Sequence, residues 1–178
     1  LLNAGEPIVD LQSAELRGIL LGKTHLSGIN LRNVDLREAH LNGAELPASD
    51  LREAKMDDAD LTGVDLSESY LRGATLRGAQ LANANLRNAI LTKSVLVGAN
   101  LRDADLTDAN LSGADLSQAD LTNANLKGVK LNGANLTAAI LNDADISLAN
   151  LNKANLTGSV AGGANLSGAN LAGAILVG

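Results

Sequence analysis

Leucine recurs at every fifth residue from Leu11 to Leu176 in this chain of 178 residues. Thirty-one of the 34 positions in this register are Leu, and the exceptions are Met56, Ile146 and Ala161. The residue two places before the register is Ala in 23 of 33 cases from Ala14 to Ala174. An unbroken period of five therefore defines the architecture of nearly the whole chain.

Neither regular secondary structure can bury a period of five. A helix turns about 100° per residue, so successive Leu would advance by about 140° and form no apolar stripe. A strand alternates its faces, so an odd spacing would send successive Leu to opposite sides. The pattern instead predicts a corner after every two or three extended residues, with every Leu directed at one axis.

The residues around the register predict the corners. Two places after each Leu, from Gly18 to Gly173, the residue is Gly in 14 of 32 cases and Asn in four. Both accept the positive φ that type II turns require. Where Asp, Glu, Lys or Gln stands there, we expect type I turns. Pro47 suits the second position of a turn. Asp or Asn, which bond to local backbone, directly precede the register in 18 of 33 cases from Glu15 to Ile175.

The triplets around the register resemble a known family. Ala-Asp-Leu occurs at residues 59–61, 104–106 and 119–121, and Ala-Asn-Leu occurs at 84–86, 134–136 and 154–156. These match the A(D/N)LXX consensus of the pentapeptide-repeat proteins, and the resemblance covers about residues 11–178. It implies an all-β fold: one right-handed quadrilateral β-helix of about eight 20-residue coils. Residues 1–10 would be the remnant of an N-terminal cap, or a linker.

One cluster of outward positions predicts a partner-binding surface. On a four-sided coil, residues 20 apart stack, which places Tyr70, the sole aromatic residue, beneath Ile90. Apolar groups beside arginines are typical of interfaces, although an apolar ladder is also tolerated on a β-surface. The candidate surface consists of Tyr70, Arg72, Arg77, Ile90, Val95 and Val97.

A second apolar set lies near the C-terminus. From Ile146 onward, Lys153 is the sole charged residue. The resemblance supports end-to-end homodimerisation there, because members of the family dimerise through their C-terminal coils. The candidate association end consists of Ile140, Leu148, Val160, Ile175 and Val177.

The remaining charges form columns that we interpret as solvated ladders. Arg32, Arg52 and Arg72 make one column. Another column holds Asp and Asn in alternation after its first members, which avoids stacking like charges about 5 Å apart; its acids are Glu45, Asp65, Asp105 and Asp145.

The sequence predicts no catalysis. It has no Cys, no Ser–His–Asp arrangement and no phosphate-binding loop. His25 and His40 lie on different sides of the coil, which does not favour a metal site, and we expect no cofactor. Acids outnumber bases 20 to 14, so no direct nucleic-acid binding is expected. No apolar run of about 18 residues is present, so we expect no membrane insertion by this segment.

The hypothesis that results is a scaffold or protein-interaction module with an unidentified protein partner. It could stand alone or form a domain of a larger protein of a family abundant in cyanobacteria. The alternative implied by the resemblance is a DNA-mimicking modulator of DNA gyrase, with which the net charge of −6 is compatible. The compartment stays open: the cytoplasm is slightly favoured for this segment, beside a larger membrane or exported parent protein.

Overall fold

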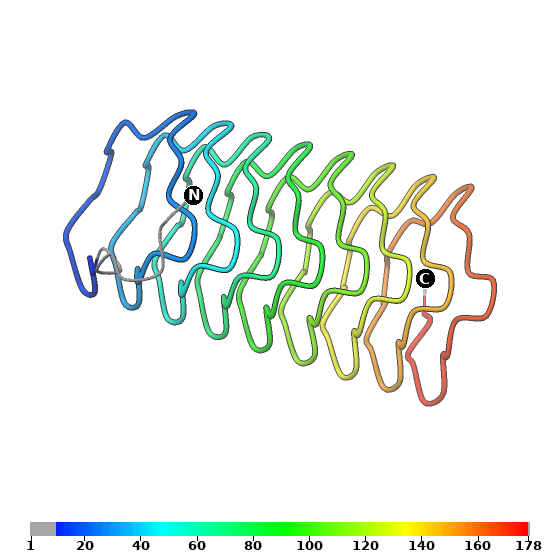
Figure 1. The fold of residues 1–178 in the computed structure, drawn as a ribbon. Coiled ribbons are helices and arrows are strands. Elements are labelled where there is room, and N and C mark those ends of the chain that lie inside the picture. The colour runs from blue at the N-terminus through cyan, green and yellow to red at the C-terminus, as the bar shows by residue number, and fades with distance from the viewer. Residues whose placement is uncertain (1–9, 178) are drawn as a thin grey trace.

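The computed structural model describes residues 10–177, which form a rod of stacked coils running from one end to the other (Figure 1). Every pairing between coils is parallel and joins residues 20 apart, from Asp10 with Asn30 to Asn155 with Ile175. Each coil therefore contains four pentapeptides, and the described residues make a little over eight coils. At the β-strand spacing of about 4.8 Å, the rod is roughly 40 Å long.

The pairings are single residues on each side, and residues 10–177 contain neither a helix nor a longer strand. Accordingly, no helix in this range is long and apolar enough to cross a membrane. Asp10 already pairs with Asn30. The cap or linker expected over residues 1–10 otherwise lies outside the described part of the chain.

Four of the five backbone N–H groups in a typical repeat bond to other backbone groups. The repeat at Leu71 is representative: Leu71 N donates to Ile90 O over 2.8 Å, and Gly73 N donates to Thr92 O over 3.0 Å. In the opposite direction, Ile90 N donates to Ser69 O over 2.9 Å. The corner itself is closed by Ala74 N donating to Leu71 O over 3.0 Å. Coil-to-coil bonds therefore come from three N–H groups in each such repeat.

The fifth N–H belongs to the residue after the register and is satisfied by a side chain. All 19 Asp or Asn residues that directly precede the register in residues 10–177 accept a bond from the N–H two residues later, with N···O distances of 2.9–3.3 Å. The predicted local role of these residues is confirmed, and it explains their frequency at this position.

Every corner has the same backbone conformation. The residue two places after the register has φ between +54° and +74° at each of the 33 corners, and 19 of these residues are not Gly. The expectation of type I turns at Asp, Glu, Lys and Gln is wrong, because Glu38 and Lys93 both have φ of +59°. A left-handed residue costs roughly 1–2 kcal/mol. The hydrogen bonds to the coils above and below offset this cost, because they form only when every corner has the same geometry.

The register residues form one continuous core. From Leu31 to Leu156 all of them are buried, with the small residues of the repeat packed beside them. Toward both ends of the described range the register becomes more exposed. Two outward positions, Asp35 and Ser147, are buried against expectation. Asp35 is 4% exposed, because the Arg37 side chain folds over it and bonds to both of its carboxylate oxygens.

Candidate interaction surface

The pairings divide the rod into four faces. Each face is a column of paired residues 20 apart and is named here for one residue of that column. The Tyr70 face carries every twentieth residue from 10 to 170, and the Val95 face carries those from 15 to 175. The Ile140 face carries residues 20 to 160, and the Glu45 face carries residues 25 to 165. The two corner residues of each repeat lie on the edges between faces.

The structure brings the six predicted surface residues together around the Val95 face. Tyr70 pairs directly with Ile90, and Val95 pairs with Thr75 on the adjoining face. Arg72 lies on the edge between these two faces, while Arg77 and Val97 lie on the next edge. Tyr70 is 48% exposed, both arginines are exposed, and the three aliphatic residues are half-buried. The six residues therefore form a contiguous strip across two adjacent coils, which we call the Tyr70 surface.

The arginines of the Tyr70 surface are available to a partner. Neither Arg72 nor Arg77 makes an ion pair within residues 10–177. Asp57, one coil below Arg77, instead accepts a bond from Arg77 N over 2.8 Å and one from the Thr75 hydroxyl over 2.9 Å. Because local bonds occupy this carboxylate, it does not hold the Arg77 guanidinium.

The structure contains a groove beside Tyr70 that the sequence did not predict. It has a volume of about 460 Å³ and is lined by Gly28, Ile29, Asn30, Ala48, Asp50, Arg52 and Tyr70. Within it, Arg52 Nε donates to Asp50 Oδ1 over 2.8 Å, and this bond lowers the pKa of the Asp50 carboxyl. The column of arginines that passes Tyr70 in the sequence could have indicated a binding surface here, but such a column by itself predicts a solvated ladder.

Two buried serines support the corner beside this groove. Ser69 Oγ donates to Leu46 O over 2.7 Å and accepts a bond from Ser49 N over 3.1 Å. Ser49 Oγ donates in turn to Leu26 O over 3.2 Å. Pro47 occupies the second corner position, as predicted, and Ala48 follows it with φ of +54°. Side-chain hydroxyls thus satisfy backbone carbonyls at this corner, which fixes the groove wall.

The predicted association end is only partly one surface. Ile140 pairs with Val160 on the Ile140 face, and Ile175 and Val177 lie on the neighbouring face and the edge between them. Leu148 is 62% exposed but lies on the diagonally opposite edge, with φ of +59°. The structure therefore gathers four of the five residues and leaves Leu148 apart.

The last coils also contain an apolar hollow. It has a volume of about 230 Å³ and is lined by residues that include Leu141, Leu156, Leu166 and Leu176. Ala161, which replaces Leu in the register, lines it too. The shorter side chain of Ala161 contributes to this space. The sequence singled out Ala161 as an exception but gave no indication of the hollow.

The remaining polar columns satisfy one another. On the Glu45 face, Asn85 Nδ2 donates to Asp65 Oδ1 over 3.0 Å, which confirms that Asn separates acids in this column. His25 Nδ1 lies 2.7 Å from Glu45 Oε2 at the end of the same column. Within residues 10–177, no group of three or more His, Cys, Asp or Glu could hold a metal ion.

Single-residue parallel pairings, four corners per coil and a filled leucine core define a four-sided β-solenoid. The family model described as pentapeptide repeats matches eight copies, which together cover residues 14–178. The chain therefore belongs to the pentapeptide-repeat family, as its triplets indicated.

A solved structure shares this fold. The chain is similar to the plasmid-mediated fluoroquinolone resistance protein QnrB1 (M102R, trypsin-treated), with 21% identity, a TM-score of 0.76, and coverage of 92% of this chain and 91% of that one. It is also similar to HetL, a pentapeptide-repeat protein involved in heterocyst differentiation regulation from the cyanobacterium Nostoc sp. strain PCC 7120. That match has 33% identity, covers 95% of this chain and 90% of that one, and has a TM-score of 0.40. The family and the likeness to QnrB1 imply a right-handed β-helix. No curated protein sequence matches this chain.

Proposed function

We propose that this chain is a non-catalytic scaffold or protein-interaction module that binds a protein partner through the Tyr70 surface. One observation supports the proposal above the others. Exposed Tyr70 and its half-buried partner Ile90 stand beside two arginines that make no ion pair within residues 10–177, on a rod whose outward positions are otherwise mostly polar.

The chemistry of this surface suits protein recognition. Tyr and Arg are the residue types that most often dominate binding energy at interfaces, because each combines a large contact area with hydrogen-bonding groups. The surface is also held by backbone bonds to the coils on either side, so little ordering entropy is lost on binding. Elsewhere the outward Asp and Asn side chains are used to cap the backbone, which favours structural over catalytic roles for them.

The test replaces the apolar pair. Tyr70→Asn with Ile90→Asn restores the residue type common at these positions and should greatly reduce partner capture in a quantitative pull-down from the native host. Thermal unfolding followed by circular dichroism checks that the rod persists. The matched control is Leu20→Asn, which replaces an exposed apolar residue at the same repeat position on the Ile140 face, outside both proposed surfaces, and should leave capture unchanged. Equal capture by the first variant and the unmodified chain would remove the Tyr70 surface as the binding site.

We also propose that the four gathered C-terminal residues Ile140, Val160, Ile175 and Val177 associate with a second copy of the chain. Three of them are about half exposed or more, and the last coils carry almost no charge to oppose contact. Sedimentation equilibrium across a range of concentrations should show a dimer that Val160→Asn weakens. A monomer mass at every concentration would exclude this association.

The second candidate function is modulation of DNA gyrase by mimicry of DNA. The acidic residues of the Glu45 face favour it, and the fold is shared with a fluoroquinolone resistance protein. Asn interrupts the acids, however, and Arg87 and His25 bind two of them. The candidate ranks second because this breaks the continuity of negative charge that mimicry needs. A supercoiling assay without inhibition at micromolar protein would remove it.

A further inference from the structure

The edge between the Tyr70 face and the Val95 face differs in charge from every other strip of the rod. Its corner residues include Arg32, Arg52, Arg72, Lys93 and Lys153, and Glu53 is the single acid among them in residues 10–177. On each of the other three edges, acids and bases are equal in number, and each of the four faces carries more acids than bases. In a chain with net charge −6, this edge is the one strip with net positive charge. We call it the basic edge.

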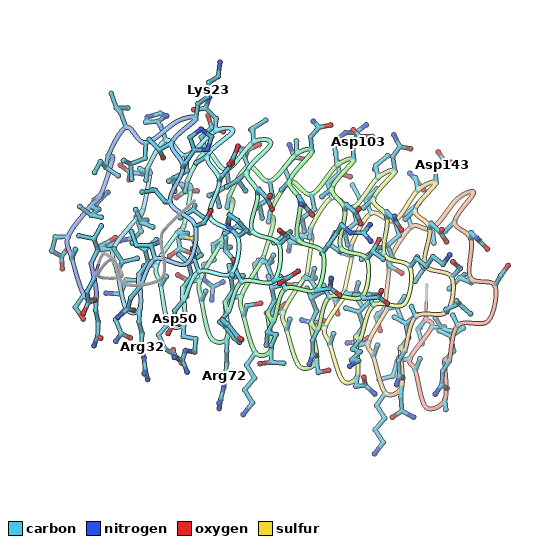
Figure 2. The ribbon with its side chains drawn as sticks, in the orientation of Figure 1. Lys23, Arg32, Asp50, Arg72, Asp103 and Asp143 are labelled. Carbon is cyan, nitrogen blue, oxygen red and sulfur yellow. The ribbon has the colours of Figure 1, made fainter. Side chains whose placement is uncertain are left out.

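The arginines of the basic edge are evenly spaced and two of them are free. Successive coils place Arg32, Arg52 and Arg72 about 4.8 Å apart along the rod. Arg52 is bound to Asp50, whereas Arg32 and Arg72 make no ion pair within residues 10–177. Figure 2 shows both projecting from the lower edge of the rod with Asp50 between them, while Lys23, Asp103 and Asp143 lie along the opposite edge. The backbones of Arg32 and Arg72 are therefore two coils, or roughly 10 Å, apart.

The groove described above lies directly beside this column. Tyr70 and Arg52 both line it, and Ile29 and Ala48 add apolar atoms from the neighbouring coils. A volume of about 460 Å³ is ample for one aliphatic or aromatic side chain. The groove and the basic edge thus offer an apolar anchor point and two carboxylate-binding groups within one surface.

We infer that the basic edge binds an acidic peptide segment, with carboxylates on Arg32 and Arg72 and one apolar side chain against Tyr70 in the groove. This inference rests on the proposed interaction function, because it uses Tyr70 and Arg72. Guanidinium groups bind carboxylates in a bidentate manner, which gives direction as well as affinity to the contact. A peptide that lies along the edge contacts a strip about as wide as one side chain. The basic residues are confined to a strip of similar width.

The surroundings favour a peptide over a nucleic acid. The Tyr70 face carries Asp10 and Asp50 against Lys130, and the Val95 face carries Glu15, Asp35 and Asp115 against Lys55. A polyanion broader than the edge would therefore meet net negative charge on both sides. Stacking of several bases also requires several aromatic side chains, and Tyr70 is alone. A short peptide avoids both obstacles.

The inference is tested by fluorescence anisotropy with a short fluorescein-labelled peptide in which Glu alternates with Ala and one central residue is Leu. Arg32→Gln with Arg72→Gln should raise the dissociation constant about tenfold, or about 1.4 kcal/mol in total, because two exposed ion pairs with the peptide are lost. The matched control, Lys23→Gln with Lys127→Gln, removes the same charge from two other edges and should change it less than about twofold, because these lysines are remote from the edge. Equal effects of the two double variants would overturn the inference.

Further probes separate the parts of the proposal. Tyr70→Ser should weaken binding of the peptide that contains Leu. Binding of a peptide with Ala in place of that Leu should be unaffected. Replacing every Glu of the peptide by Gln should abolish binding. A single-stranded oligonucleotide of equal charge that bound as tightly, with the same loss in the arginine variant, would show a general anion strip and overturn the assignment to a peptide.

This experiment and the pull-down fail independently. If Tyr70→Asn with Ile90→Asn abolishes partner capture while no acidic peptide binds, the basic edge is excluded and the interaction function stands. If the peptide binds through Arg32 and Arg72 while capture is unaffected, the Tyr70 surface is excluded as the partner site and the basic edge stands.

Discussion

The coils up to Asp145 and the coils that follow share one register but differ in what surrounds it. In the earlier coils, charged side chains bond along and between repeats, as Arg37 does with Asp35 and Arg102 with Asp120. In the later coils, Lys153 is the sole charge, and Leu148, Val160 and Ile175 are exposed. The same backbone bonds link the coils in both regions as far as Gly158 N, which donates to Val177 O over 2.7 Å. The core register and the surface are therefore specified independently, so a uniform fold can carry unlike surfaces.

The largest expected effect tests whether the core is uniform along the rod. Leu86 is fully buried, whereas Leu166, in the same column, is 40% exposed. Leu86→Ala should lower the free energy of unfolding by about 3 kcal/mol, because it leaves a cavity among packed neighbours. Leu166→Ala should cost less than about 1 kcal/mol, since water already reaches that side chain. Urea unfolding measures both, and equal losses would contradict the difference between the two regions.

The next effect tests the hollow of the last coils. Ala161→Leu should raise the free energy of unfolding by about 1 kcal/mol, because the new side chain buries apolar surface in existing space. The same substitution at Ala144 enters a filled core and should lower the free energy of unfolding by about 1–3 kcal/mol. Opposite signs in urea unfolding would confirm that the hollow is specific to this end. A loss at both positions would show that the last coils are as tightly packed as the rest.

A smaller effect tests an ion pair in the coils up to Asp145. Hydrogen bonds from the Arg37 side chain lower the pKa of Asp35 from 3.8 to about 2. Because the folded pKa is depressed, the stabilisation is complete above about pH 4 and is lost as the pH falls toward 2. We expect about 1 kcal/mol, allowing for the partly exposed guanidinium. Asp35→Asn and Arg37→Gln should each flatten the pH dependence of urea unfolding in that window. An unchanged slope in both variants would rule out this ion pair as its cause.

The smallest effect concerns one corner of the last coils. Leu148 adopts φ of +59°, which costs a residue with a side chain roughly 1–2 kcal/mol. Leu148→Gly should therefore raise the free energy of unfolding by about 0.5 kcal/mol, after the greater flexibility of Gly in the unfolded chain is subtracted. Gly168→Ala, at the same corner of the next coil, should destabilise instead, because a residue with a Cβ is strained at its φ of +70°, and the Leu148 side chain must also move away from the new Cβ. A stabilising Gly168→Ala would show that the corner is not under this constraint.

The candidate site was predictable in its residues and not in its shape. Tyr70, Arg72 and Ile90 stand out in the sequence because they break the pattern of their positions, and the 20-residue pairing then makes them neighbours. The groove was not predictable, since it depends on Gly28 and Ala48 from two other coils. The difference between Arg52 and Arg72 is local, because Asp50 stands two residues before Arg52 and bonds to it, whereas Tyr70 stands two residues before Arg72.

The leucine register alone predicts that this chain folds as a solenoid with leucines inside. A period of five leaves no regular helix or strand that could bury the register, and each Asp or Asn before it bonds to a backbone group two residues away, which is a local interaction. Contacts between coils set the common conformation of the corners and the positions of the groove and the hollow. These features arise from bonds and packing between residues 20 apart, so they depend on how each coil meets the next.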